Sequence, residues 1–482
     1  PPRKADVIIK GDRILGIGAF PNKKADEVVD ALGMMLTPGF IDVHNESDHY
    51  LSLFSHPSHE DFLLQGVTTV IGGQCGASLA PLLYGSLEAI RKWADINSIN
   101  VNWHTLKECF NAVKTLSLGV NWGTLVGHST VRRAILGDAL RDLTERELAV
   151  MERIMDEALA QGALGISTGL SYTHTKQTPF RELMLLAKCA ARANAVYATH
   201  LRDESAHVVK AVDETVYLVE QAKVRAIISH FRPLRGFERD YATAFEHLES
   251  RANNLPLYFT TNASDMSLAP LYTLLPAWAQ RGSFEMMDIA LRDPRTAERI
   301  AHELPQISLN DITILRAPDA EYLEGLTLAR FAWNRGLRAK DALFTLMCAA
   351  GLRAVVLYPN TDLDFNVQTL QSPRALVGSF RPTLPPSFRA PLPHDLSFPF
   401  AQYLETVTSL KLMPMPEAIA RVSGRPAAHF GLHARGIVRE GMAADLALFE
   451  GTRATHVWVN GMHVVRDGIF QGKTAGRILT RA

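Results

Sequence analysis

The fold class is decided by residues 196–230, VYATHLRDESAHVVKAVDETVYLVEQAKVRAIISH. Two short apolar runs, at 196–201 and 225–230, flank a longer stretch of helical character. A strand, a helix and a second strand in this order predict parallel strands joined by a crossover helix. The stretch therefore indicates an α/β protein built on a parallel sheet.

Similar apolar runs recur along the chain and number eight in all: GFIDVH, VTTVIGG, WGTLVG, ALGISTGL, VYATHL, RAIISH, LPLYFTTN and RALVGSF. Helical stretches separate most of them. Eight alternating units predict a (β/α)8 barrel, the TIM-barrel architecture. The segment 276–345 is too long for one connection, so we expect a mainly helical insertion after the seventh strand.

The two ends of the sequence each predict a β-hairpin. Near the start, ADVIIK and RILGIG are joined by Gly11 and Asp12, and near the end HVWVNGMHVV carries Asn460-Gly461 between two alternating runs. A lone two-stranded hairpin is marginal in water, so the two hairpins gain by packing together. We expect a small β-sandwich domain from residues 1–37 and 434–482, with the barrel at 38–433.

The composition excludes several classes of function. The chain has 482 residues, 50 Lys+Arg and 50 Asp+Glu, so its formal charge of zero argues against a nucleic-acid partner. The sequence contains no uninterrupted run of about 18 apolar residues, so we expect no membrane span. The four cysteines show no disulfide spacing and no signal peptide is evident at the start. We therefore expect a cytoplasmic protein that acts on a small molecule.

Residue types that bind metals stand at the ends of four predicted strands. They are His44, Cys75, His200 and His230. A lone histidine at such a place is more often a hydrogen-bonded rim residue, and a lone cysteine is more often a buried apolar group. The C-terminal ends of barrel strands share one rim, however, so all four side chains converge there. Because imidazole and thiolate are preferred zinc ligands, the pattern predicts a zinc site.

The motifs around these residues resemble those of a known family. TPGFIDVHNESD, QGVTTVIGGQCGASLAP, LVGHSTVR, GALGISTGLSY, YATHLRDE and ISHFR occur in the order seen in the D-aminoacylases, the N-acyl-D-amino-acid deacylases of the amidohydrolase superfamily. SGRPAAHFGLHARGIVREGMAADLALFE and VWVNGMHVVRDG extend the resemblance over nearly the whole chain. It implies a zinc-dependent barrel with a small β-domain that hydrolyses an amide. It also implies that Cys75, His200 and His230 bind the tightly held zinc, most simply one ion per chain.

The sequence departs from the family at the first and eighth strands. The family's His-x-His is His44-Asn45-Glu46, and Glu46 faces the same side of the strand as His44. Glu46 could bind metal, serve as general base, or pair with an arginine. The family's Gly-Ser-Asp aligns with Gly378-Ser379-Phe380, so the usual catalytic acid is absent. A rival alignment places Asp362 or Asp364 there instead.

The residues that bind the substrate carboxylate in the family also differ. Arg232 stands where the family has Lys, and Tyr172 keeps the place of a family Tyr. A second family Tyr is lost at Thr260-Thr261-Asn262-Ala263, and the family's Arg is lost at His394-Asp395-Leu396. We expect the substrate to contact the following side chains: Tyr172, Arg232, Phe380 and His394.

Three hypotheses for function follow from this pattern. The first is zinc-dependent hydrolysis of the N-acyl bond of a small amino-acid-derived substrate, with Glu46 replacing the missing Asp. The second is a non-hydrolytic cyclisation, elimination or acyl transfer on the same scaffold, and the third is a catalytically inactive homologue that keeps zinc.

Asp203, Glu204 and His128 also stand near strand ends, where polar groups more often orient ligands or cap helices.

Overall fold

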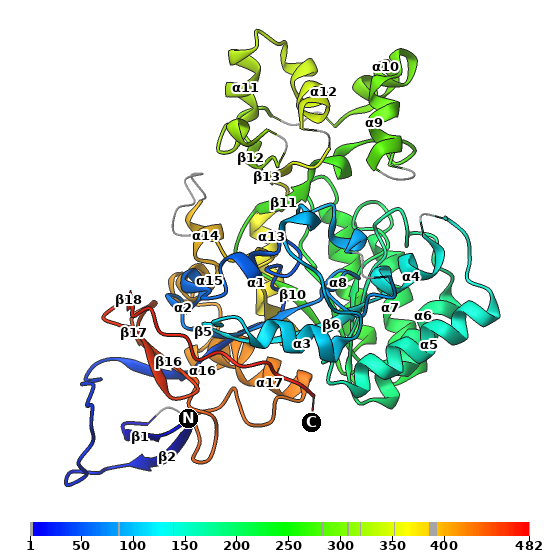
Figure 1. Cartoon of the computed structure of the whole chain (residues 1–482). Coiled ribbons are helices and arrows are strands. Elements are labelled where there is room, and N and C mark those ends of the chain that lie inside the picture. The colour runs from blue at the N-terminus through cyan, green and yellow to red at the C-terminus, as the bar shows by residue number, and fades with distance from the viewer. Residues whose placement is uncertain are drawn as a thin grey trace.

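The computed structural model describes residues 3–84, 87–137, 139–280, 284–305, 308–318, 320–350, 352–384 and 393–481. Figure 1 shows a central barrel, an insertion above it, and a smaller β-domain at its lower left that contains the N-terminus, whereas the C-terminus lies beside α17 beneath the barrel. No helix among these residues is long and apolar enough to cross a membrane.

The barrel is a single sheet of eight parallel strands, which confirms the predicted fold class. Its strand order is β14-β10-β9-β8-β7-β6-β5-β4. The strands are β4 (Phe40–Asp42), β5 (Val67–Gly72), β6 (Asn121–Gly127), β7 (Gly165–Gly169), β8 (Val196–His200), β9 (Arg225–Ile228), β10 (Leu257–Thr261) and β14 (Ala375–Val377). The sheet closes just past β14, where the Phe380 amide donates to the His44 carbonyl at 3.0 Å.

Each barrel strand coincides with one of the eight apolar runs, because strands buried on both faces need apolar residues at nearly every position. A core cluster that includes Ile41, Ile71, Leu125 and Leu376 draws residues from most of the strands. The barrel is therefore filled by side chains, as is usual for this architecture.

Helices surround the barrel. They are α1 (Ser52–Ser55), α2 (Glu60–Leu63), α3 (Leu106–Lys114), α4 (His128–Leu136), α5 (Glu145–Ala160), α6 (Phe180–Arg192), α7 (Val208–Ala222), α8 (Glu238–Arg251), α13 (Leu363–Gln371), α14 (His394–Ser397), α15 (Pro399–Ser409), α16 (Met415–Val422) and α17 (Gly424–Phe430). The buried residues of α7 include Val208, Val212, Thr215 and Val219, a spacing of three or four that gives one buried face.

The small β-domain combines both ends of the chain. Near the N-terminus, β1 (Asp6–Lys10) and β2 (Arg13–Gly18) form an antiparallel hairpin. A five-stranded sheet joins β3 (Met35–Pro38) to β15 (Leu446–Glu450), β16 (Arg453–Val459), β17 (Met462–Arg466) and β18 (Ile469–Phe470). The two sheets share a core that contains Ile14 and Leu446. The two turns also touch, since a Cβ at Gly461 would lie 1.8 Å from the Gly11 carbonyl oxygen.

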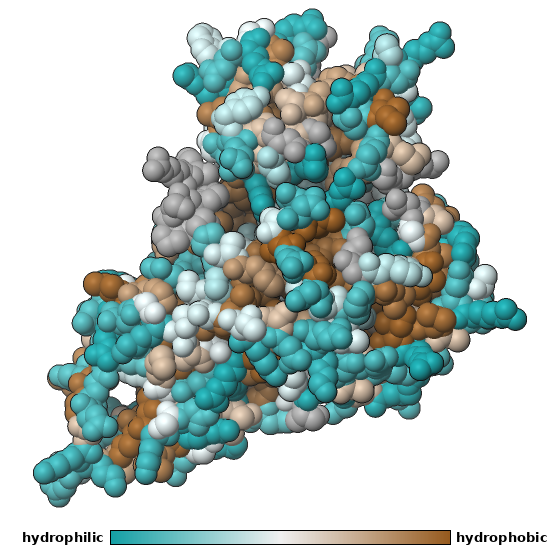
Figure 2. Space-filling model, in the orientation of Figure 1, coloured by the Kyte–Doolittle hydropathy of each residue, from teal (hydrophilic) through white to brown (hydrophobic). Residues whose placement is uncertain are grey.

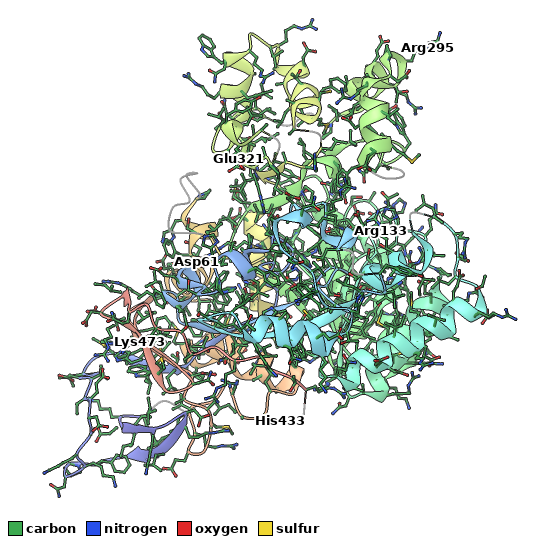
Figure 3. All side chains as sticks on the ribbon, in the orientation of Figure 1. Asp61, Arg133, Arg295, Glu321, His433 and Lys473 are labelled. Atoms are coloured by element: carbon green, nitrogen blue, oxygen red, sulfur yellow. The ribbon has the colours of Figure 1, made fainter. Side chains whose placement is uncertain are left out.

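The insertion follows β10 and has its own hydrophobic core and a three-stranded antiparallel sheet. Its elements are β11 (Met266–Pro270), α9 (Phe284–Arg292), α10 (Pro294–Glu303), β12 (Thr313–Arg316), α11 (Leu328–Asn334), α12 (Ala339–Ala349) and β13 (Val355–Pro359). Segment 276–345 therefore contains the predicted helices and also one strand, β12, which pairs with β13 beyond the end of the segment. In Figure 3, Arg295 and Glu321 mark the insertion, at the end of the molecule opposite His433 and Lys473.

Candidate active site

The four predicted metal-binding side chains meet at the C-terminal rim of the barrel. The Cys75 Sγ lies 3.7 Å from His44 Nε2 and 3.5 Å from His230 Nε2. His230 Nε2 in turn lies 3.1 Å from His200 Nδ1. Residues from four separate strand ends therefore place one sulfur and three nitrogens around a single small space.

Two of these residues have an unusual backbone conformation. Cys75 has φ 51° and His230 has φ 34°, in the left-handed region that side chains rarely adopt. Such outliers cluster at functional sites, where the surrounding structure holds them in place. Next to Cys75, Gly76 leaves no room for a side chain, since a Cβ there would lie 2.7 Å from the Gly169 amide nitrogen.

The spacing of the donor atoms fits a zinc ion. Tetrahedral zinc, with bonds of about 2.3 Å to sulfur and about 2.0–2.1 Å to nitrogen, places its S and N ligands roughly 3.6 Å apart. The distances of 3.5 and 3.7 Å from Cys75 Sγ to the nitrogens of His230 and His44 match that edge length. The donor set and its geometry thus suit the ion that the family resemblance implies.

Electrostatics favours a thiolate at Cys75. Burial alone would raise the pKa of this thiol, but the charge of His44 and hydrogen bonds from His200 and His230 outweigh burial and hold the pKa well below its usual range. The thiolate is the form that binds metals. Burial lowers the pKa of His44, although the charge of Cys75 and the hydrogen bond to it oppose this shift.

Glu204 is a member of this site that the sequence analysis left aside. Its carboxylate lies 3.0 Å from His200 Nε2 and 2.8 Å from His230 Nδ1, on the ring nitrogens that face away from Cys75. Burial would raise the pKa of Glu204, but the two imidazoles lower it well below the usual range. A carboxylate in this position fixes the tautomer and orientation of both histidines. The available sequence signal was its place four residues after His200.

Glu46 lies in the same cavity, with Oε1 3.9 Å from His44 Nε2. Its side chain is 13% exposed and makes no recorded ion pair with an arginine among the described residues. Burial, reinforced by the nearby charge of Cys75, raises the pKa of Glu46 well above its usual range. A carboxyl group with a raised pKa next to a metal-binding cluster is suited to exchanging protons.

Phe380, which the motif resemblance aligns with the family's Asp, lies just past the end of β14. Its ring meets the His44 ring edge-on, with centroids 4.9 Å apart, and it lines the cavity. Asp362 instead caps the start of α13, where it accepts a hydrogen bond from the Phe365 amide, and Asp364 lies within that helix. The rival alignment of the eighth strand is therefore wrong.

The cavity has a volume of about 570 Å³ and lies between the barrel rim and the insertion. Tyr172 lines it, with its ring edge-on to His200 at 5.1 Å between centroids. Arg232 also lines it, but its Nη2 donates to the carbonyl oxygens of Ser264 (3.0 Å) and Met266 (2.7 Å). Figure 2 shows hydrophobic surface gathered where the insertion meets the barrel.

The remaining polar residues near the strand ends lie outside this arrangement. His394 is exposed at the start of α14, where its Nδ1 lies 3.2 Å from Gln402 Oε1, and the structure does not bring it into the described cavity lining. His128 is buried against Glu182 at 2.7 Å. Asp203 accepts hydrogen bonds from the backbone amides of Ser205 and His207.

A thiol and three imidazoles gathered at the C-terminal rim of a (β/α)8 barrel define the class of metal-binding barrel enzymes. Comparison with known proteins makes this more specific. The amidohydrolase family model matches residues 27–292. D-aminoacylase of Alcaligenes xylosoxydans xylosoxydans is 30% identical, over 100% of this chain and 94% of its own length. N-acyl-D-aspartate deacylase of the same organism is 31% identical, over 96% and 89%.

A solved structure leads to the same group. N-acyl-D-glutamate deacylase from Bordetella bronchiseptica, complexed with zinc and a phosphonate inhibitor, superposes with a TM-score of 0.81 at 26% identity, over 100% of this chain and 96% of that one. The chain therefore belongs to the amidohydrolase family and, within it, to the D-aminoacylase group, as its motifs predicted.

Proposed function

We propose that this protein is a zinc-dependent hydrolase that cleaves the N-acyl bond of a small amino-acid-derived substrate. The observation that carries the proposal is the cluster of Cys75, His200 and His230, with His44 beside it, in the wall of a cavity of about 570 Å³. The relatives named as D-aminoacylase and N-acyl-D-aspartate deacylase support the type of bond.

Cys75, His200 and His230 would hold one zinc ion, and His44 lies close enough to serve as a further ligand. When bound, zinc polarises a scissile carbonyl and lowers the pKa of a coordinated water toward about 7. Glu204 keeps His200 and His230 oriented throughout, because it contacts the ring nitrogen of each that faces away from the cluster.

Glu46 would move the proton. Its carboxyl lies 3.9 Å from His44 Nε2 and lines the cavity, and Phe380 supplies no acid at the end of β14. We propose that the Glu46 carboxylate takes a proton from the attacking water and returns it to the departing amine. Phe380 and the insertion would limit access of bulk water to that exchange.

The proposal is tested by incubating zinc-loaded protein with a panel of N-acyl-D- and N-acyl-L-amino acids and measuring the amine released. We expect release from at least one compound, and a fall of about 10²–10⁴-fold in kcat for Glu46→Gln, because proton transfer by a positioned side chain contributes that much. Glu145→Gln, whose side chain is 83% exposed, is the matched control and should keep the wild-type rate.

Absence of amine release across the panel would contradict hydrolysis. The mass of any product separates the alternatives, because hydrolysis adds one water whereas cyclisation or elimination does not. Metal analysis should give about one zinc per chain. Zinc retained without turnover of any compound would favour the inactive homologue.

A further inference from the structure

Lys92 is a half-buried basic residue beside the active site that the sequence pattern did not single out. It lies behind two rings of the cavity wall and is not itself among the residues that line the described cavity. It lies in the segment after β5, which also contains Cys75. Its Nζ is 3.1 Å from the ring centroid of Tyr172 and 4.0 Å from that of Trp93. Both rings line the cavity. One aromatic ring, Tyr172, therefore separates this ammonium group from His200, which the ring meets edge-on.

The aromatic rings around Lys92 are held rigidly. Trp93 is 3% exposed and stacks on His49 with ring centroids 4.3 Å apart. Tyr172 meets Trp93 edge-on at 5.9 Å. Aromatic faces attract an ammonium group, and two of them fix where it stands. The position of Lys92 is thus determined by packing rather than by an ion pair.

Lys92 has no carboxylate partner within the described parts of the chain. No carboxylate oxygen there is recorded within 4.0 Å of its Nζ, although burial lowers the pKa of this side chain well below its usual range. The arginines of the cavity differ in this respect. Arg132 pairs with Glu182, Arg141 pairs with Glu147, and Arg232 donates to two backbone carbonyls.

A desolvated ammonium group is costly unless an anion accompanies it. The carboxylate of an N-acyl amino acid stands only a few bonds from the amide that is cleaved. A group that binds this carboxylate must therefore lie close to the metal-binding cluster, as Lys92 does. Arg232, the residue at the family's lysine position, is already engaged at the base of the insertion.

We propose that Lys92 binds the α-carboxylate of the substrate and so determines specificity for N-acyl amino acids over their neutral analogues. The inference rests on the proposed function for the identity of the substrate. Lys92 would take the place of the family's carboxylate-binding side chains that this sequence lacks at Thr260–Ala263 and at 394–396. The substrate would then lie with its carboxylate toward Trp93 and Tyr172 and its amide at the metal-binding cluster.

The test compares the N-acetyl derivatives of D-leucine, D-aspartate and D-glutamate with their α-carboxamides, which differ only at the proposed contact. In the wild-type protein we expect the acids to be preferred in kcat/KM, mainly through KM. Lys92→Met should remove about 10- to 100-fold of that preference, the range expected for a charged hydrogen bond, and Lys92→Arg should restore part of it. Lys176→Met removes an exposed cation at the cavity rim and should change the preference far less.

A second measurement does not depend on turnover. Isothermal titration of metal-free protein with the same acids and carboxamides reports binding alone, with circular dichroism to show that each variant is folded. Acids that bind no tighter than their carboxamides, or an unchanged difference in folded Lys92→Met, would overturn the inference. Lys92-dependent binding without hydrolysis would instead overturn the proposed function and leave the carboxylate site standing. Hydrolysis that keeps its preference for acids in Lys92→Met would overturn the carboxylate site at Lys92 and leave the proposed function standing.

Discussion

Phe380 determines much of the character of this site at the scale of single residues. Its φ of 53° lies in the left-handed region, where aromatic residues are uncommon and Asp and Asn are several-fold enriched. Its ring covers the edge of His44 and lies 6.0 Å from the His230 ring, centroid to centroid. A backbone that suits Asp therefore carries a side chain that can neither bind a metal nor accept a proton.

Replacing Phe380 by Asp should add metal-binding capacity. The backbone at this position already has a conformation that Asp tolerates, and the new carboxylate would stand beside His44 and Glu46. We expect the zinc content of folded Phe380→Asp protein to rise from about one toward two ions per chain in zinc-replete buffer, measured by mass spectrometry of the metals. The matched control is Phe380→Asn, which has the same shape without the charge and should stay near one. An unchanged zinc content in Phe380→Asp would show that Glu46 and His44 cannot complete a second site.

At the scale of elements, the insertion is joined to the barrel through the segment between β10 and β11. Arg232 holds the carbonyls of Ser264 and Met266, and Asn366 Nδ2 donates to the Asn262 carbonyl at 2.6 Å. Residues 267–270 then continue into the cavity wall. The position of β11, and with it the shape of the cavity, depends on these contacts.

Arg232→Lys should loosen this connection. An ammonium group lacks the planar fork with which a guanidinium group donates several hydrogen bonds at once. We expect faster amide hydrogen exchange in residues 262–270 and 355–361, measured by mass spectrometry, with the rest of the barrel unchanged. Arg251→Lys, at an exposed ion pair with Asp213, is the control and should leave exchange in both segments as it was. A raised KM without faster exchange would instead assign Arg232 to the substrate.

The barrel strands could be predicted from sequence because parallel strands that are buried on both faces consist of consecutive apolar residues. The convergence of Cys75, His200 and His230 with His44 could be predicted because strand ends share one rim. Lys92 could not, since a single charged residue in a loop has no periodicity that separates it from a solvated one. Glu204 was noticed only for its place near a strand end, and its contacts with His200 and His230 could not be predicted. The strand β3 was missed as well, because its four residues, Met35–Pro38, end in a proline and pair only with a strand far away in sequence.

At the scale of the whole molecule, a buried polar network joins the small β-domain to the barrel. Asp445 accepts hydrogen bonds from the Asn460 amide at 2.7 Å and from Asn121 Nδ2 at 3.0 Å, and it pairs with Arg435. Its own carbonyl accepts from the Gly39 amide at 2.8 Å, directly before β4. One side chain thus connects the C-terminal sheet to β6, and its backbone connects it to β4.

Asp445→Ala should destabilise the fold without touching the metal-binding cluster. Removing one partner of a buried pair leaves Arg435 as an uncompensated charge, at a cost of about 3–5 kcal/mol. We expect a lower denaturant midpoint in urea unfolding followed by circular dichroism, and unchanged zinc content in the folded protein. Glu145→Ala, with a side chain that is 83% exposed, should lie within about 0.5 kcal/mol of wild type. Equal stability of the two variants would refute this role for Asp445.

The pairing of β3 with β15 has a consequence for the folding of this chain during its synthesis on the ribosome. During synthesis β3 emerges before any strand of the barrel, yet its partner emerges only after the last one. For most of translation the nascent chain exposes an unpaired strand edge, of the kind that invites aggregation. Slowing elongation within the barrel region should therefore lower the yield of native protein, and chaperones that shield exposed apolar segments should restore it.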